Sequence, residues 1–272
     1  MSNWIIVRGG GDLATGTIHR LWSVGFPVLV LETDAPSAIR RQVSACEAIY
    51  EGRVTIEGMT AARITTIEEA EVVFQRGEVP VLVDPQGEVI PVLRPAVVVD
   101  GILAKKNLGT HRNMAPLTVA LGPGFIAGKD VDVVIETKRG HNLGRVIREG
   151  AAAKNTGIPG MIGGYAAERV IHAAQAGILK NSHHIGDVVG TGEPIAMIVS
   201  EDGTEYPIPA PIPGIIRGLI RDGYQVPKGF KIADIDPRLK ELSNCFTISD
   251  KARCISGSVL EVIVGWLNNR RA

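Results

Sequence analysis

Cysteine is scarce in this 272-residue sequence, and its placement excludes several kinds of site. Cys46, Cys245 and Cys254 are far apart, odd in number and form no C-x-x-C pair. They predict neither a disulfide framework nor a zinc site, and they fit a reducing cytoplasm. The sequence also has no H-x-x-x-H pair, facial triad or carboxylate cluster. We therefore expect no protein-held metal.

Neither sign of charge is in excess, since 29 Lys and Arg residues balance 29 Asp and Glu residues. The overall charge therefore attracts neither nucleic acid nor a membrane surface, and an anion site needs a local group of basic residues. No uncharged apolar run approaches the ~18 residues of a transmembrane helix. Glycines and Asp12 interrupt the N-terminal apolar run too early for a signal peptide. We expect a cytoplasmic protein with no membrane or nucleic-acid partner.

The first two-thirds of the chain alternates apolar, β-branched runs with stretches of helical periodicity, which is typical of a parallel sheet covered by helices. Continuous apolar runs suit strands that are buried on both faces. Helices are expected at "ATGTIHRLWSVG", "APSAIRRQVSACEAI" and "TIEEAEVVFQRG", and "ETKRGHNLGRVIREG" is expected to be another strand–Gly–helix junction. The expected fold is a Rossmann-like, doubly wound, mostly parallel sheet in residues 1–182. Its strands are "WIIVR", "PVLVLE", "PVLVD", "AVVVDG", "LTVALG" and "VDVVIE".

The composition changes near His183, where very short β segments are divided by Gly and Pro. Two similar halves, "GDVVGTGEPIAMI" and "DGYQVPKGFKIADI", resemble the biotinyl- and lipoyl-type barrel-sandwich hybrid over residues 183–236. The hairpin "VSEDGTEYP" between them has no Lys for a swinging arm, so a structural insert is favoured over a carrier. Residues 237–272 return to helix, with an apolar stripe that predicts packing against the first domain.

The opening run "IIVRGGGDLATG" fits G-x-G-x-x-G/A at Gly9, Gly11 and Ala14, between an expected strand and an expected helix. Glu32 ends the second strand about 20 residues later, where an acidic residue can accept from ribose hydroxyls. The free N–H groups of Gly10, Gly11 and Asp12 at a helix start could contact a phosphate. A tight strand–helix turn without a ligand is the alternative.

Glycine and basic residues also follow the later strands. If the sheet is parallel, they meet the first motif on one edge, where ligands of such sheets bind. A loop histidine with one backbone hydrogen bond is about as plausible for His141 as phosphate contact or acid–base work. Each of these segments alone is typical of a solvated surface. Because all of them are expected at the same edge of the sheet, together they predict a site for a phosphate-bearing ligand. The residues are Lys105, Lys106, Asn107, Gly122, Gly124, Arg139, His141 and Arg145.

The segments "VRGGGDLATGTIHRL", "AKKNLGT", "LGPGFIAGKDVDVVIETKRGHNLGRVI", "NTGIPG" and "KIADIDPR" together resemble the YqeB family. The resemblance runs over nearly the whole chain and is most specific from Leu121 to Ile147. Proteins of this family are accessory proteins of the selenium-dependent molybdenum hydroxylase system. The resemblance implies a maturation role, with a molybdopterin dinucleotide or another nucleotide as ligand. It implies the hydroxylase or its cofactor-insertion machinery as partner, and it leaves open whether the protein forms a homo-oligomer.

Two other functions remain open from the sequence. The opening motif by itself suggests an NAD(P)-dependent oxidoreductase, with Lys105 or His141 available as proton donor. The β segment suggests an unmodified, carrier-like scaffold. No catalytic residue is assigned, and no cysteine falls within a motif of the resemblance, which disfavours direct sulfur or selenium transfer. Binding is better supported than catalysis.

Overall fold

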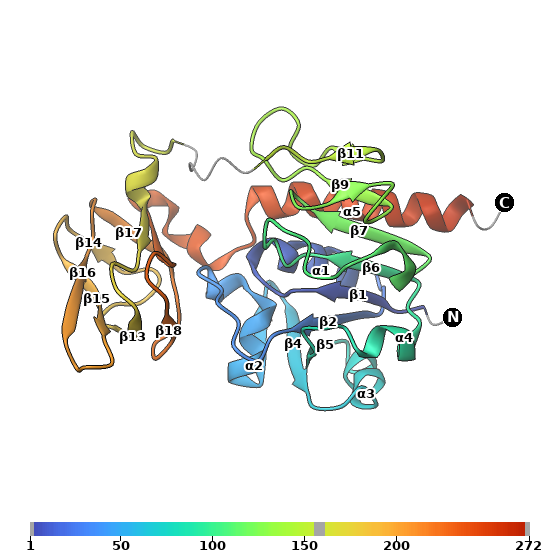
Figure 1. The fold of residues 1–272 in the computed structure, drawn as a ribbon, viewed down its shortest axis with the longest axis horizontal. Coiled ribbons are helices and arrows are strands. Elements are labelled where there is room, and N and C mark those ends of the chain that lie inside the picture. Colours follow the sequence, from blue (N-terminus) through green and yellow to red (C-terminus); the bar gives the residue numbers. More distant parts are fainter. Residues whose placement is uncertain (1–2, 155–160, 270–272) are drawn as a thin grey trace. The chain divides into compact units, whose positions relative to one another are not determined.

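The computed structural model describes residues 3–154 and 161–269 (Figure 1). It divides into two compact units with separate cores. Unit 1 comprises Met1–Pro36, Ser44–Thr156 and Ile248–Ala272, and unit 2 comprises Ser37–Val43 and Gly157–Thr247. The expected ranges 1–182, 183–236 and 237–272 follow sequence order, whereas both units combine segments that are distant in the sequence.

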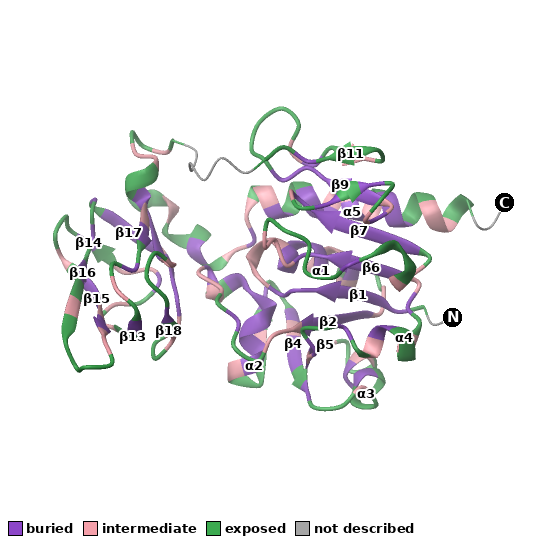
Figure 2. Cartoon of the chain, in the orientation of Figure 1, coloured by how far each residue is buried: buried purple, intermediate pink, exposed green. Residues whose placement is uncertain are grey.

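Unit 1 is built on a nine-stranded sheet in the order β10-β9-β7-β6-β1-β2-β5-β4-β3. The six expected strands all form and pair in parallel at the centre, and Figure 2 shows their burial. They are β1 (Ile5–Arg8), β2 (Val28–Glu32), β5 (Val79–Val83), β6 (Val97–Asp100), β7 (Leu117–Leu121) and β9 (Val133–Ile135). Three further strands complete the sheet, namely β3 (Arg53–Ile56), β4 (Met59–Ile64) and β10 (Val146–Ile147).

Both edges of this sheet are antiparallel. β3 and β4 form a hairpin at one edge, and β10 turns back on β9 at the other. A separate pair, β8 (Ile126–Ala127) and β11 (Gly150–Ala151), is also antiparallel. The sheet is therefore mixed, with a parallel centre.

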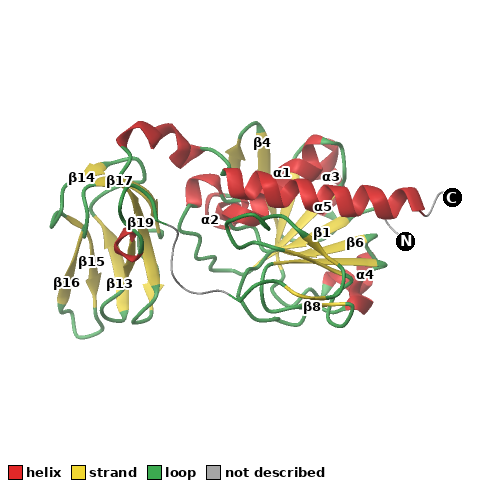
Figure 3. Ribbon diagram, turned by 90° about the horizontal axis from the view of Figure 1, so that it is seen from above, coloured by secondary structure: helices red, strands yellow, loops and turns green. Residues whose placement is uncertain are grey.

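Helices α1 (Asp12–Ser23) and α5 (Asp250–Asn269) lie side by side over one face of the sheet, and α4 (Val89–Leu93) lies on the other face (Figure 3). The apolar stripe of α5 is buried through Ile255, Val259 and Ile263. The remaining helices of unit 1 are short: α2 (Ala48–Glu51), α3 (Glu69–Gln75), η2 (Ala45–Glu47) and η3 (Arg112–Met114). Thr66 and Glu69 contact each other at the start of α3, where the Thr66 amide donates to Glu69 Oε1 at 3.0 Å.

Unit 2 consists mainly of two antiparallel sheets of four strands each. One has the order β12-β19-β17-β14 and the other β16-β15-β13-β18. The strands are β12 (Val170–His172), β13 (Gly177–Asn181), β14 (Val188–Val189), β15 (Pro194–Val199), β16 (Glu205–Pro209), β17 (Gly214–Leu219), β18 (Gln225–Val226) and β19 (Lys231–Asp236). Its 3-10 helices are η1 (Arg41–Val43), η4 (Ala167–Arg169) and η5 (Leu239–Phe246).

The expected Rossmann-like, doubly wound domain with a barrel-sandwich hybrid is wrong. Helices alternate with the strands only as far as β6, since no α-helix connects β6 to β7 or β7 to β9, and the C-terminal helix α5 contacts β7 and β9 instead. Residues 183–236 do not make a unit of their own, since β12 and β13 supply strands to the two antiparallel sheets. Apolar runs identify buried strands, but they do not encode what connects or covers them.

Two expected helices are also absent. The "APSAIRRQVSACEAI" segment contributes Ser37–Val43 to unit 2, and only short 3-10 turns and α2 follow it. The segment after β9 forms a turn and enters β10. In both places backbone contacts with other segments replace the helical hydrogen bonds that the local sequence favoured.

Candidate functional site

The glycine run after β1 forms the tight connection into α1, and its first two glycines are explained by close packing. A Cβ at Gly9 would lie 2.9 Å from the Cα of Ile102, and Gly9 has a φ of +89°. A Cβ at Gly10 would lie 2.9 Å from the amide nitrogen of Cys46. Backbone, and not a ligand, therefore occupies the space beside Gly9 and Gly10.

Gly11 differs from its neighbours because a Cβ there would meet nothing within 4 Å. It is the N-cap residue of α1, and as a glycine it has no side chain to cap this end of the helix. The Asp12 carboxylate accepts from the adjacent Leu13 amide at 2.8 Å. The start of α1 is thus the part of the glycine loop that leaves space for another molecule, with helix N–H groups beside it.

Glu32 binds the glycine loop itself. Its Oε2 accepts from the Gly10 amide at 2.7 Å, and its Oε1 accepts from the Thr33 amide at 2.8 Å. Burial raises the pKa of Glu32, and these two backbone hydrogen bonds partly oppose that shift. The Gly10 amide, expected to meet a phosphate, is therefore engaged by the residue that was expected to meet a ribose.

Carboxylates hold the loops at the ends of other strands in the same way. Asp84, after β5, accepts from the Gly87, Glu88 and Val89 amides at 2.8–3.0 Å. Glu136, after β9, accepts from the Lys138 amide at 2.7 Å and from the Ala153 amide at 2.8 Å. These carboxylates satisfy backbone donors of the loops, so this edge of the sheet contains buried acidic groups among the basic residues that the sequence predicted.

At the end of β6, Asp100 belongs to a buried network with Arg8. Thr110 Oγ1 accepts from Arg8 Nη1 and donates to Asp100 Oδ2, both at 2.5 Å. Arg8 also donates to the Pro85 carbonyl at 2.8 Å, and both charged residues are 2% exposed. Burial raises the pKa of Asp100, opposed by hydrogen bonds from Thr110 and Ile102 and by the Arg8 charge. No local sequence pattern predicts this network, because Arg8 is more than 90 residues from the other two members along the chain.

The loops after β6 and β7 contact each other as predicted from their positions at strand ends. A Cβ at Gly124 would lie 2.7 Å from the Lys106 amide nitrogen, and one at Gly122 would lie 2.5 Å from Thr137 Oγ1. Lys105 and Lys106 are exposed, and Lys105 has a φ of +62°. Asn107 supports the turn, since its Oδ1 accepts from the Gly109 and Thr110 amides at 2.9 and 2.8 Å.

The turn after β9 carries the predicted basic residues, but it contains no helix to present them. Arg139 forms a bidentate ion pair with Asp250, with Nη–Oδ distances of 2.7 and 2.8 Å. His141 and Arg145 are exposed, and neither begins a helix. Arg139 is therefore bound to the first residue of α5. The "NTGIPG" motif of the resemblance, residues 155–160, lies outside the described residues.

Lys251, which the sequence did not single out, lies at the start of α5 among charged residues from three segments. Burial lowers the pKa of Lys251 and the Arg139 charge adds to the effect, while Asp12, Glu136 and Asp250 oppose it. Lys251 is the second residue of α5, which packs against α1, and its charge interacts with that of Asp12 at the start of α1. The signal for Lys251 is tertiary, because the start of α5 is more than 200 residues from α1 in sequence.

The cysteines give no support for thiolate chemistry at the glycine loop. Cys46 is 1% exposed, and burial together with Glu32, Glu47 and Asp12 raises its pKa well above the ordinary value. Its thiol is therefore neutral and unsuited to nucleophilic attack. Within residues 3–154 and 161–269 no three His, Cys, Asp or Glu residues are placed to hold a metal ion. In the same ranges no helix is long and apolar enough to span a bilayer.

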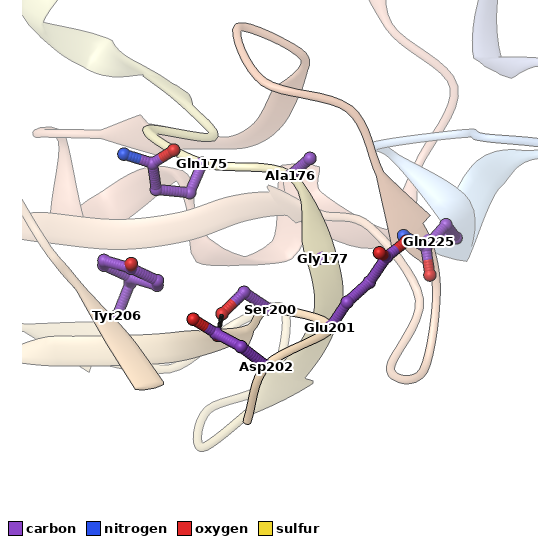
Figure 4. Close-up of a pocket in the computed structure, with 8 residues that line it drawn as sticks. All are labelled: Gln175, Ala176, Gly177, Ser200, Glu201, Asp202, Tyr206 and Gln225. Carbon is purple, nitrogen blue, oxygen red and sulfur yellow. Dashed lines mark hydrogen bonds between the residues drawn. The ribbon is translucent and has the colours of Figure 1, made fainter. Parts of the chain in front are cut away.

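Unit 2 has an open pocket of about 430 Å³ at the ends of β13 and β15 (Figure 4). Glu201 and Asp202 are its charged lining residues, and Asp202 is already held by Ser200 Oγ at 2.5 Å and by the Thr204 amide at 3.0 Å. Tyr206, Gln175 and Gln225 also line it. This pocket lacks the basic residues that an anionic ligand needs, so the start of α1 is the better candidate for the predicted ligand.

Comparison with known proteins gives one relative of similar sequence. No protein-family model matches the chain. The uncharacterized protein YqeB of Escherichia coli K12 is 48% identical over 260 residues, which is 96% of this chain and 47% of that protein. The chain thus spans about half the length of this relative.

Solved structures align only loosely. A succinylglutamate desuccinylase/aspartoacylase from Rhodobacter sphaeroides is 15% identical with a TM-score of 0.30, and 87% of this chain covers 86% of that one. An aspartoacylase family protein from Mesorhizobium loti is 10% identical with a TM-score of 0.27, at 86% and 84% coverage. Neither is similar enough to inform the site. The sequence identity supports the YqeB family: over nearly its whole length, this chain is a relative of the uncharacterized protein YqeB.

Proposed function

We propose that unit 1 binds a phosphate-bearing ligand at the start of α1, between the backbone of Gly11 and the ammonium of Lys251. The observation that carries the proposal is the half-buried Lys251 at the start of α5, which packs against α1, together with the open space beside Gly11. Burial disfavours this ammonium, and an anion next to it would stabilise its charged form. The Asp12 carboxylate opposes an anion, and the Lys251 charge compensates for it.

The ligand follows from the family resemblance. In an accessory role in maturation of a selenium-dependent molybdenum hydroxylase, the bound molecule is a molybdopterin dinucleotide or another nucleotide. The partner in that role is the hydroxylase or its cofactor-insertion machinery. Unit 1 then holds the ligand without transforming it, in keeping with the neutral Cys46 thiol. An NAD(P)-dependent oxidoreductase remains an outcome that the ligand test can reveal.

Replacing Lys251 by methionine is expected to weaken binding of inorganic pyrophosphate and of cytidine diphosphate by roughly tenfold to a hundredfold. A hydrogen bond to a charged group contributes about 1.5–3 kcal/mol, and about 1.4 kcal/mol corresponds to a tenfold change in affinity. Titration calorimetry measures the effect, and Lys129→Met is the control because Lys129 is an exposed lysine elsewhere in unit 1. Equal affinities for Lys251→Met and the original protein would exclude this site.

The affinity for pyrophosphate is also expected to fall as the pH rises toward the ordinary lysine value of 10.5. The pKa of Lys251 is lowered, so the ammonium loses its proton, and with it the attraction for an anion, at a lower pH than an exposed lysine does. Lys251→Arg should bind with little dependence on pH in this window, since arginine stays protonated. Binding of NAD(H) with no response to pyrophosphate or cytidine nucleotides would favour the oxidoreductase instead.

A further inference from the structure

In unit 2, β19 pairs with β12 and β17, and the register shifts by one residue on each side. The extra residue is Ile232 of β19 on one side and Arg217 of β17 on the other. Residues three apart in a regular strand face opposite ways, but the extra Ile232 brings Lys231 to the side of Asp234. Lys231 Nζ lies 3.9 Å from Asp234 Oδ2, and Arg217 Nη1 lies 4.0 Å from the same oxygen. The two bulges thus bring cations from neighbouring strands to one carboxylate.

Asp234 has a third cation beside it, since Arg169 Nη2 lies 3.5 Å from Asp234 Oδ1. Arg169, Arg217, Lys231 and Asp234 are hereafter the Asp234 cluster. Asp234 and Arg169 are buried, and the Arg217 side chain is 19% exposed. A single carboxylate balances one of the three positive charges. The cluster therefore holds two positive charges in excess, in a position where burial makes uncompensated charge unfavourable.

Asp236, two residues further along β19, forms a complete ion pair and shows the contrast. It accepts from Arg238 Nε at 2.9 Å and from Arg238 Nη2 at 2.7 Å, which is a bidentate arrangement. The distances from Asp234 to Arg217 and Lys231 are too long for hydrogen bonds. Among the residues that the structure describes, neither of these two side chains donates a hydrogen bond to another residue. Their donors are therefore available to a further acceptor.

We propose that Arg217 and Lys231 bind a dianionic phosphoryl group on unit 2, with Arg169 balancing Asp234 beside it. A guanidinium presents paired N–H donors to two oxygens of such a group, and an ammonium adds a compact charge. The two excess positive charges of the Asp234 cluster match the charge of a phosphoryl dianion. All four residues belong to unit 2, so this site is separate from the one proposed at the start of α1 and does not rest on it.

Titration calorimetry of the full chain with inorganic phosphate tests this site. Every variant also carries Lys251→Met, so that the ammonium proposed to bind an anion at α1 does not contribute. In this background Arg217→Met and Lys231→Met are each expected to weaken phosphate binding by about tenfold or more. Arg217→Lys should recover part of the affinity, because the charge remains and the paired donors are lost. Asp234→Asn is expected to bind phosphate more tightly, since it removes the carboxylate that repels the anion.

Lys180→Met is the matched control, since Lys180 is an exposed lysine on β13, in the other antiparallel sheet of unit 2. Weaker binding in Arg217→Met and Lys231→Met, with unchanged binding in Lys180→Met, supports the proposal. An equal loss in Lys180→Met overturns it, as does unchanged affinity in Lys231→Met, whose half-exposed side chain makes it the deciding variant if Arg217→Met does not fold.

Two further results separate this site from its alternatives. Malonate that binds more tightly than phosphate would overturn the phosphoryl assignment in favour of a dicarboxylate. A chain that carries only Lys251→Met and binds no phosphate would overturn the site at the Asp234 cluster, and it would leave the proposal at α1 intact. Retained phosphate binding in that chain, lost on adding Lys231→Met, supports the Asp234 cluster whatever the outcome at α1.

Discussion

Replacing Asp100 by alanine is expected to lower the free energy of unfolding of unit 1 by about 3–5 kcal/mol, because a buried charge that loses the opposite charge near it is strongly destabilising. Thr110 connects the two charges, accepting from Arg8 and donating to Asp100. Without the carboxylate, Arg8 keeps its charge at 2% exposure and loses the group that balances it. Urea denaturation monitored by circular dichroism measures the change as a lower midpoint.

The matched variant removes both charges. Arg8→Met with Asp100→Leu is expected to recover much of the loss, because apolar replacements of a buried ion pair are often neutral or stabilising. If Asp100→Ala alone is as stable as the original protein, the Arg8 charge is balanced elsewhere and the network does not hold this end of the sheet. If the double variant is no better than Asp100→Ala, the loss comes from the loop after β6 and not from the unbalanced charge.

Gly16→Val is expected to destabilise unit 1 by about 1–3 kcal/mol, the usual range for overpacking a buried contact. A Cβ at Gly16 would lie 2.7 Å from the Ala252 Cβ and 2.9 Å from the Ala252 carbonyl oxygen, so α1 and α5 would have to separate. Glycine is ordinarily the poorer helix former, by up to about 1 kcal/mol. Packing should outweigh propensity here, because part of the obstruction is backbone.

Gly257→Ala provides the control on the partner helix. A Cβ at Gly257 meets nothing within 4 Å, so this substitution is expected to stabilise α5 by about 0.5–1 kcal/mol through helix propensity alone. Thermal melting of both variants distinguishes the two effects by their sign. A melting temperature that rises in Gly16→Val as well as in Gly257→Ala would show that α1 and α5 can move apart at little cost.

The sequence predicted the parallel centre of the large sheet and one shared edge for its loops. Each central strand is a continuous apolar run, a local property that sequence reveals directly. The Gly124–Lys106 contact followed from the same reasoning, since carboxyl ends of neighbouring parallel strands lie together. The YqeB resemblance, now supported by 48% identity over 260 residues, also came from local motifs.

Tertiary contacts decided the role of the opening glycine run. By sequence all three glycines were candidate ligand-binding residues, with Gly10 and Gly11 expected to contact a phosphate, but Gly9 and Gly10 are required by the backbone of Ile102 and Cys46. Gly11 alone among them is open in the structure. Gly9 and Gly10 differ from Gly11 because segments distant in the sequence pack against them, and no local sequence pattern indicates this packing.

The fold class and the assignment of Lys251 as the cation of the candidate site likewise follow only from the tertiary structure. The local pattern predicts a helix over 35–49, but Ser37–Val43 packs within unit 2, where Arg40 and Ile39 have hydrogen-bond partners about 180–207 residues away. Lys251 reaches the start of α1 because α5 packs against that helix. Local sequence determined which segments are strands and which residues carry charge. Long-range packing determined which of them meet, because burial and hydrogen bonding depend on partners that are remote in the chain.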